Sequence, residues 1–180
     1  MAAIPTTYDD LIWLMCRRYW RGVDIEGRSF DMRWIKAQIM AESEYRPHAV
    51  SPVGARGLMQ LMPGTSKDVA RELGIPDNPF DPYINIMMGI YYLRKMWNIF
   101  RRERDLERLR FAFAAYNAGA GNIIKAQMRA DERGYPTDKW ASIAKVLASV
   151  TGAANARQTT RYIAKIERYY TDLRMQEKKR

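Results

Sequence analysis

The sequence predicts a mostly α-helical protein that folds as a single domain, residues 1–180. Between its proline and glycine breakers, nearly every segment repeats its apolar residues every three or four positions rather than in alternation. Of the 180 residues 47% are hydrophobic, including five Trp, eleven Tyr and eleven Met. This length and composition are sufficient for one hydrophobic core without disulfide support, so a disordered chain is not expected.

The N-terminal part of the chain is predicted to contain two helices. The first runs from Tyr8 to about Trp20, within an N-terminal helical extension at residues 1–30. Cys16 lies in this helix and is expected to be a small core residue, because single cysteines are usually buried. The second helix covers 31–43, and its apolar residues recur at spacings of three and four. Its mainly apolar face is formed by Trp34, Ile35, Gln38, Ile39 and Glu42.

Two stretches contain too much glycine and proline for long helices. Residues 22–29 are expected to form a loop, and residues 45–64 an interrupted segment with room for a small β-hairpin. Thr65 and Asp68 have the spacing of a capping box. A third helix is therefore expected to begin at Thr65 and to end at Gly74, a typical C-terminal glycine.

The rest of the chain is predicted as a series of helices. Asp81 and Pro82 have the pattern of an N-cap followed by a first-turn proline, so a fourth helix should begin there. The basic run at 101–104 is expected to be a solvated connection, and residues 176–180 a basic tail. The predicted helices of this part cover about 81–100, 106–118, 122–129, 138–150 and 158–175.

Charge and composition limit the possible functions. The net charge of +10 predicts attraction to polyanions, which include nucleic acids, anionic membranes and the carboxylate-bearing bacterial wall. Cys16 and His48 are the only residues of their kinds, so we expect no metal site, no cofactor and no Ser-His or Cys-His relay. His48 is expected to be an exposed loop residue. No run of about 18 apolar residues predicts a membrane span, and the N-terminus lacks the pattern of a secretion signal.

Glu42 is the strongest candidate for a catalytic residue. A carboxyl group on an apolar helix face loses solvation, which is expected to raise its pKa. An acid that remains protonated near neutral pH can donate a proton to the leaving oxygen of a glycosidic bond. From spacing alone, Glu42 could also be a residue at the edge of the face whose carboxylate reaches water or a basic partner.

The segment 51–63, SPVGARGLMQLMP, has a composition that suits a sugar. Its glycines allow the backbone to approach a ligand closely. Met59 and Met62 offer adaptable apolar surface, and Gln60 offers both a hydrogen-bond donor and an acceptor. A sugar ring has apolar faces and a polar rim, so these groups complement it, although a methionine-rich turn is also common in core packing.

Three motifs occur in order along the chain. They are AESEYRPHAVSPVGARGLMQLMPGT at 41–65, AYNAG at 115–119 and QTTRYI at 158–163. Together they resemble the soluble lytic transglycosylase domain family of the goose-type lysozyme superfamily, over about residues 34–166. The resemblance implies a lysozyme-like helical domain that cleaves bacterial peptidoglycan. Gln158 departs from the family, which usually has a Glu there, so any salt bridge made by that Glu must be absent or replaced.

The resemblance also implies a role for each matching residue. Glu42 matches the catalytic glutamate, and Ser43 and Gly57 are expected to give structural support. Tyr116 and Asn117 match a turn that closes the site opposite the acid, and Tyr162 matches a tyrosine that points towards it. The residues expected to contact the sugar are Ser51, Met59, Gln60, Met62, Tyr116, Asn117 and Tyr162.

A single catalytic carboxylate is consistent with the reaction that the resemblance implies. Glu44, the other acidic residue of the motifs, lies about 200° around the helix from Glu42 and should point away. In the family's reaction, the 2-acetamido group of N-acetylmuramic acid attacks the anomeric carbon, and the 6-hydroxyl then closes a 1,6-anhydro ring. Glu42 would protonate the leaving oxygen and later accept the proton of that hydroxyl.

Other functions remain open at this stage. A muramidase would use water as the acceptor, and a wall-binding module would not cleave glycan at all. Nucleic-acid binding has only the charge in its favour, because the basic residues are spread along the chain. Peptidoglycan lies outside the cytoplasmic membrane, so the enzyme must reach it by some route. We expect a phage lysis enzyme (an endolysin) that acts as a monomer and is released through a holin. A virion or secretion component, or a chain whose signal has been removed, would also fit. Phage or bacterial origin, wall chemotype and endo or exo action stay open.

Overall fold

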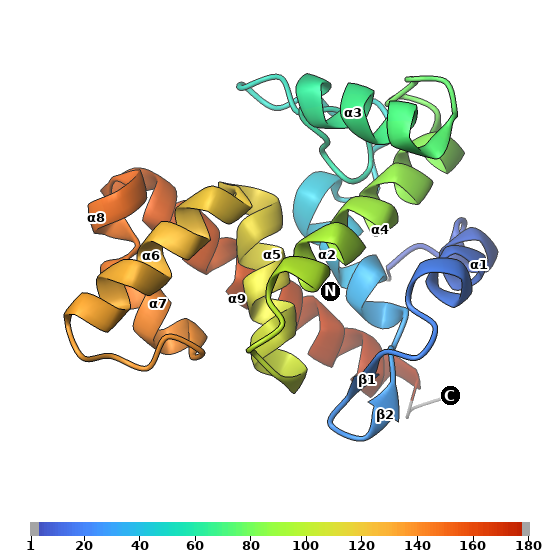
Figure 1. Ribbon diagram of the computed structural model, residues 1–180. Helices are drawn as coiled ribbons and strands as arrows, with labels where there is room; N and C mark the ends of the chain where they lie inside the picture. The colour runs from blue at the N-terminus through green and yellow to red at the C-terminus, as the bar shows by residue number, and fades with distance from the viewer. Residues whose placement is uncertain (1–3, 178–180) are drawn as a thin grey trace. The chain divides into compact units, whose positions relative to one another are not determined.

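The computed structural model describes residues 4–177, whose regular secondary structure is helical apart from one small sheet (Figure 1). The prediction of a mostly α-helical fold is confirmed. Within the described residues the elements are α1 (Asp9–Tyr19), β1 (Asp24–Ile25), β2 (Arg28–Ser29), α2 (Arg33–Ser43), α3 (Pro63–Leu73), α4 (Pro82–Ile99), α5 (Asp105–Ala118), α6 (Ala120–Glu132), α7 (Trp140–Val146), α8 (Ala148–Thr151) and α9 (Ala153–Glu177).

The contacts divide the chain into two compact units. Unit 1 contains the described residues 4–23, 30–92 and 166–177, and unit 2 contains residues 24–29 and 93–165. The helices α4 and α9 contribute residues to both units. The interpretation of residues 1–180 as one domain stays a prediction.

The core of unit 1 forms where α1, α2 and the C-terminal part of α9 bury their apolar faces. Trp34 of α2 stacks on Tyr170 of α9, with ring centroids 3.6 Å apart and ring planes within 5°. The Tyr170 hydroxyl donates to Asp31 Oδ2 at 3.0 Å, just before α2. Each large apolar side chain buried here contributes roughly 1.5–3 kcal/mol to stability. Those without exposed surface include Ile12, Ile35, Ile39, Leu58, Ile86 and Met88.

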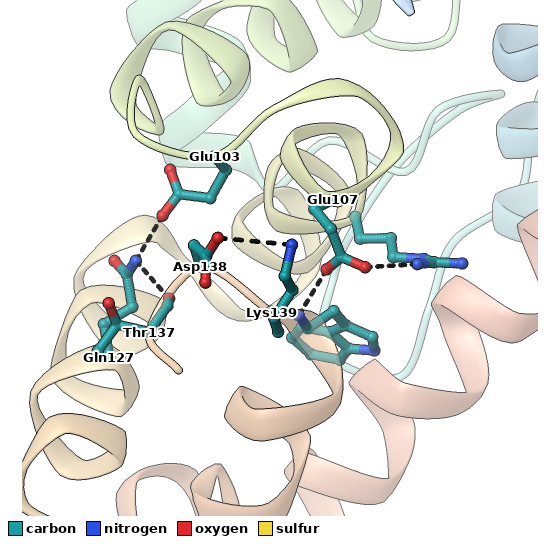
Figure 2. Close-up of polar contacts among 8 residues, drawn as sticks. Glu103, Glu107, Gln127, Thr137, Asp138 and Lys139 are labelled. Carbon is teal, nitrogen blue, oxygen red and sulfur yellow. Dashed lines mark hydrogen bonds and ion pairs between the residues drawn. The ribbon is translucent and has the colours of Figure 1, made fainter. Parts of the chain in front are cut away.

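Unit 2 is built around α5. Five consecutive residues of this helix, 111–115, are buried, so the helix is covered on all sides rather than on one face. Glu107 connects α5 to α7, because its Oε2 accepts the backbone N–H of Trp140 at 2.6 Å (Figure 2). Its other oxygen pairs with Arg110 one turn later, at 2.7 Å. Glu107 thus caps an otherwise unpaired N–H at the start of α7.

Residues 24–29 form a β-hairpin, so the prediction of a loop over 22–29 is wrong for these residues. β1 and β2 pair in antiparallel register, with Asp24 opposite Ser29 and Ile25 opposite Arg28. The two turn residues, Glu26 and Gly27, have φ values of 53° and 73°. Two left-handed residues in succession are what a two-residue hairpin turn requires. Strands of two residues are too short to show the alternation by which strands are recognised in a sequence. Within residues 45–64 the structure has isolated antiparallel bridges instead of paired strands.

The start of α3 also differs from the prediction. The helix begins at Pro63 rather than at Thr65, and Met62 before it has an extended backbone. Proline suits the first turn because its fixed φ is helical and it needs no N–H partner. No side chain caps this end. Asp68, predicted to complete a capping box, instead pairs with Arg71 at 2.7 Å on the exposed surface.

Several local predictions are confirmed. Asp81 caps α4, because its Oδ1 accepts the N–H groups of Tyr83 and Ile84 at 2.8 and 3.0 Å. Gly74 ends α3 with a φ of 65°, and His48 is exposed. Of the predicted basic tail, residues 176–177 belong to α9, and the remaining three lie outside the described residues. Across residues 4–177, no helix has both the length and the apolar character needed to cross a membrane.

We predict that Cys16 is inert in the folded protein. Its side chain is buried in α1, and burial, followed by the nearby charge of Asp31, raises the pKa of the thiol to about 12. Because the thiolate is the reactive form, an aromatic disulfide reagent at pH 8 should label it only after denaturation, with one thiol per chain. Rapid labelling of the native protein would contradict its burial.

Candidate active site

Glu42 lies one residue before the C-terminal end of α2 and is half-buried. The helix ends here because Glu44 and Tyr45 adopt left-handed backbone angles, with φ values of 55° and 61°. The Ser43 carbonyl accepts both the backbone N–H of Arg46 at 3.1 Å and its Nε at 3.0 Å. Glu44 is exposed, which agrees with its predicted direction away from Glu42.

Ser43 connects the end of α2 to the loop that follows it. Its side chain is 1% exposed, and its Oγ donates to the Leu58 carbonyl at 2.7 Å. A buried hydroxyl must find a partner, so this bond fixes both groups. Glu42 is therefore held beside the segment that contains Gln60.

Ser51 organises the tight turn that precedes this segment. The backbone N–H of Ser51 donates to the Ala55 carbonyl at 2.9 Å, and Ser51 Oγ accepts the Ala55 N–H at 2.9 Å. Because the hydroxyl oxygen is the acceptor in this contact, its hydrogen can be donated to a ligand. Val53 at the tip of the turn is 74% exposed.

Gly57 and Asn85 hold the centre of the loop against α4. Asn85 is fully buried; its Oδ1 accepts the Met59 N–H at 2.7 Å, and its Nδ2 donates to the Arg56 and Pro79 carbonyls at 3.1 and 2.9 Å. A Cβ at Gly57 would lie 2.1 Å from the Pro79 oxygen and 2.3 Å from Asn85 Nδ2, and its φ is 78°. Only glycine fits this position.

Gln60 presents a hydrogen-bond acceptor. Its Nε2 donates to the carbonyls of Ala49 at 3.1 Å and Gly57 at 2.9 Å, so both amide hydrogens are used within the loop. The remaining polar atom, Oε1, can accept a hydrogen bond from a ligand. The residue is half-buried and has a φ of 47°.

The two methionines of the loop have different environments. Met62 is 43% exposed, so its thioether can contact a ligand. Met59 has no exposed surface and packs on Gly89 of α4, where a Cβ would lie 2.3 Å from its sulfur. Both methionines were predicted to contact the sugar, but Met59 lies in the packing beneath the loop.

The other predicted site residues lie in unit 2. Tyr116 and Asn117 occupy the last turn of α5, and both are half-buried. Asn117 Oδ1 accepts a hydrogen bond from Thr159 Oγ1 at 2.9 Å, so its amide hydrogens are left for another partner. Tyr162 is 7% exposed and lies three residues after Thr159, on the same face of α9.

The structure thus gathers the predicted residues in two groups. Glu42, Ser43 and the loop residues belong to unit 1, whereas Tyr116, Asn117 and Tyr162 belong to unit 2.

Two supporting residues were missed, Asn85 and Thr159. The sequence feature that could have indicated Asn85 is its polar amide side chain within the otherwise apolar run of α4. Gln158, where the family has Glu, is exposed. Over residues 4–177, no group of three or more His, Cys, Asp or Glu side chains is placed to hold a metal ion.

Comparisons with known proteins identify the chain's relatives. The transglycosylase SLT domain model matches residues 25–138. The membrane-bound lytic murein transglycosylase F of Desulfosudis oleivorans is 38% identical over 156 residues, which cover 81% of this chain and 33% of that protein. The soluble lytic murein transglycosylase of Salmonella typhimurium is 40% identical over 124 residues, or 66% of this chain and 17% of that protein.

A solved structure agrees with these matches. The 70 kDa soluble lytic transglycosylase of Escherichia coli superimposes with a TM-score of 0.61 and 28% identity, over 94% of this chain and 25% of that one. The chain therefore spans a third or less of the length of these relatives.

We predict that Asn85→Ala destabilises the protein by at least about 2 kcal/mol, because it leaves the buried Met59 N–H and the Pro79 carbonyl without a partner. Chemical denaturation monitored by circular dichroism would measure the change. Asn98→Ala is the matched control, since Asn98 is exposed on the same helix and should change stability by less than about 0.5 kcal/mol. Equal effects of the two substitutions would exclude this stabilising role of Asn85.

Proposed function

This chain belongs to the transglycosylase SLT family, and on that premise we propose that it is a lytic transglycosylase that cleaves peptidoglycan glycan strands, with Glu42 as acid and base. The substrate bond would be the β-1,4 linkage from N-acetylmuramic acid to N-acetylglucosamine. The relatives bear the names of lytic murein transglycosylases, which supports this reaction class for the shared domain.

One observation carries the proposal: a half-buried carboxyl group is held beside a loop of sugar-compatible groups. The Ser43 to Leu58 hydrogen bond of 2.7 Å places the end of α2 against this loop. The loop offers the Gln60 Oε1 acceptor, the Ser51 hydroxyl and the exposed Met62. Acceptor, donor and apolar surface are the three kinds of group that a sugar with acetamido and hydroxyl substituents requires.

In the proposed reaction, Glu42 first protonates the leaving glycosidic oxygen. The acetamido oxygen of N-acetylmuramic acid attacks the anomeric carbon as the glycosidic bond breaks. The 6-hydroxyl then attacks that carbon, displaces the acetamido oxygen and returns its proton to the Glu42 carboxylate. One residue acts in turn as acid and base, and the product is a 1,6-anhydro end. In unit 2, the amide hydrogens of Asn117 and the hydroxyl of Tyr162 are proposed to bind glycan.

A muramidase is the alternative on the same fold, and it would release a reducing end because water replaces the 6-hydroxyl. The names of the relatives favour the transglycosylase. A non-catalytic wall-binding module would have no need of an acid at Glu42.

We predict that Glu42→Gln lowers the turnover of purified sacculi by at least about 10²-fold, because the amide cannot donate the proton. Glu44→Gln, two residues later and exposed, should retain near-normal turnover. Mass spectrometry of the wild-type digest should show 1,6-anhydro ends. Reducing ends would establish the muramidase, and normal turnover by Glu42→Gln would exclude this residue as the acid.

We further propose that the protein acts as a monomer on the wall outside the cytoplasmic membrane, after release through a holin-type membrane hole. Expression inside a Gram-negative host should then leave cells intact until a holin is co-expressed, and turbidity should fall only afterwards. Lysis by the chain alone at the same expression level would contradict this route.

A further inference from the structure

Positive charge is concentrated in unit 2. This unit holds 16 of the 30 Lys and Arg residues but only 8 of the 20 Asp and Glu residues. It therefore accounts for eight of the ten excess positive charges. The basic run 101–104, which connects α4 to α5, is part of this excess.

The one acidic residue of that run faces inward. Glu103 is 3% exposed, and its Oε1 accepts Gln127 Nε2 at 2.6 Å (Figure 2). Gln127 also donates to the Thr137 carbonyl at 3.0 Å, so the buried carboxylate is tied to α6. Arg101 and Arg102 are exposed and make no ion pair with the residues that the structure describes. Their charges are therefore not neutralised at the surface.

A groove of about 490 Å³ lies beside these arginines, entirely within unit 2. Its polar lining includes Arg101, Arg102 and Asp131. Its apolar lining includes three exposed side chains, Ile99 at 45%, Ile124 at 43% and Met128 at 61%. Large apolar side chains gathered around a groove indicate a binding surface.

The charge pattern selects the kind of ligand. Guanidinium groups bind carboxylates through paired hydrogen bonds. Asp131 lies on α6 rather than on the connection that carries the arginines, so the groove offers negative charge on a different wall. A matching ligand therefore has carboxylates, an ammonium group and small apolar side chains.

We propose that this groove binds the peptide stems of peptidoglycan. Such stems carry the carboxylates of glutamic acid and of the chain end, alanine methyl groups, and, in many walls, a diamino acid with a free amine. Arg101 and Arg102 bind the carboxylates, Asp131 binds the amine, and the apolar residues contact the methyl groups. The choice of ligand rests on the proposed function, although the groove itself does not.

The two arginines of the groove are distant from the residues of unit 2 that are proposed to bind sugar. Arg102 precedes α5 and Asn117 lies in its last turn, and a helix of 14 residues is about 20 Å long. The arginine end of the groove therefore takes a stem other than the one on the sugar beside Asn117, from farther along the strand or from a neighbouring strand. It is a second attachment point on the wall, not part of the chemistry.

A sugar-free stem peptide tests the groove directly. Isothermal titration with a synthetic Ala-Glu-diaminopimelate-Ala tetrapeptide should give saturable binding to the wild type. The double variant Arg101→Glu/Arg102→Glu should lose at least about tenfold in affinity, as expected when charge-assisted hydrogen bonds are removed. The matched control, Arg157→Glu/Arg161→Glu, reverses two exposed charges of unit 2 outside the groove and should bind normally. Circular dichroism of both variants establishes that they are folded.

Three results would overturn the proposal: no binding by the wild type, equal affinities for wild type and groove variant, or equal losses in the two variants. Wild-type affinity for an acetylated peptide that lacks the free amine should be lower, and equal affinity would exclude Asp131 as its partner. Binding of polyglutamate as tight as that of the stem would show only general attraction to anions, and would also overturn the proposal.

A second measurement separates this inference from the proposed reaction. The groove variant should cleave peptide-free glycan strands at the wild-type rate but intact sacculi at least about tenfold more slowly at low substrate concentration. If the wild type cleaves neither substrate yet binds the peptide, the proposed reaction fails and the groove assignment stands. Equal rates of wild type and groove variant on sacculi would contradict a role in wall attachment.

Discussion

The arrangement of the candidate site depends on the hydrogen bond between Ser43 and the Leu58 carbonyl. A helix end and an irregular loop each leave backbone groups without partners, and burial makes such groups costly. The Ser43 hydroxyl satisfies one of them from the helix side, at 2.7 Å. Asn85 satisfies two others from α4, the Met59 N–H and the Pro79 carbonyl. These buried bonds fix the structure around Glu42, which lies half-buried at the end of α2.

The close packing of this loop explains two glycines that a helix or turn alone would not require. Gly57 leaves room for the Asn85 amide and the Pro79 carbonyl, and Gly89 leaves room for the Met59 side chain. Glycine within a helix costs about 1 kcal/mol relative to alanine. At Gly89 that cost is offset, since the absent Cβ lets a fully buried methionine fill the space between the loop and α4. Loop and helix therefore have interdependent sequences.

The sequence was informative where a signal is local. The Asp81 cap, the glycine that ends α3 and the helical periods each concern a few neighbouring residues, and the family motifs marked Glu42 and Gln60 directly. Long-range contacts left no comparable trace. The amide of Asn85 pairs with residues 26 and 29 positions earlier, and Thr159 with one 42 positions earlier. The Thr65 cap failed because Pro63 is the better first-turn residue, and the hairpin at 24–29 is too short for a periodic signal.

Unit 2 shows the same use of buried polar groups for positioning. Thr159 holds the carbonyl oxygen of the Asn117 side chain, which determines that the amide hydrogens face elsewhere. Glu103 turns its carboxylate inward to Gln127, so the exposed side chains of the run 101–104 are all basic. The Thr159 hydroxyl thus orients the Asn117 amide. The Gln127 amide holds the Glu103 carboxylate away from the surface. The two arginines beside the groove keep their charge as a result of the second bond, because an exposed carboxylate at position 103 would neutralise one of them.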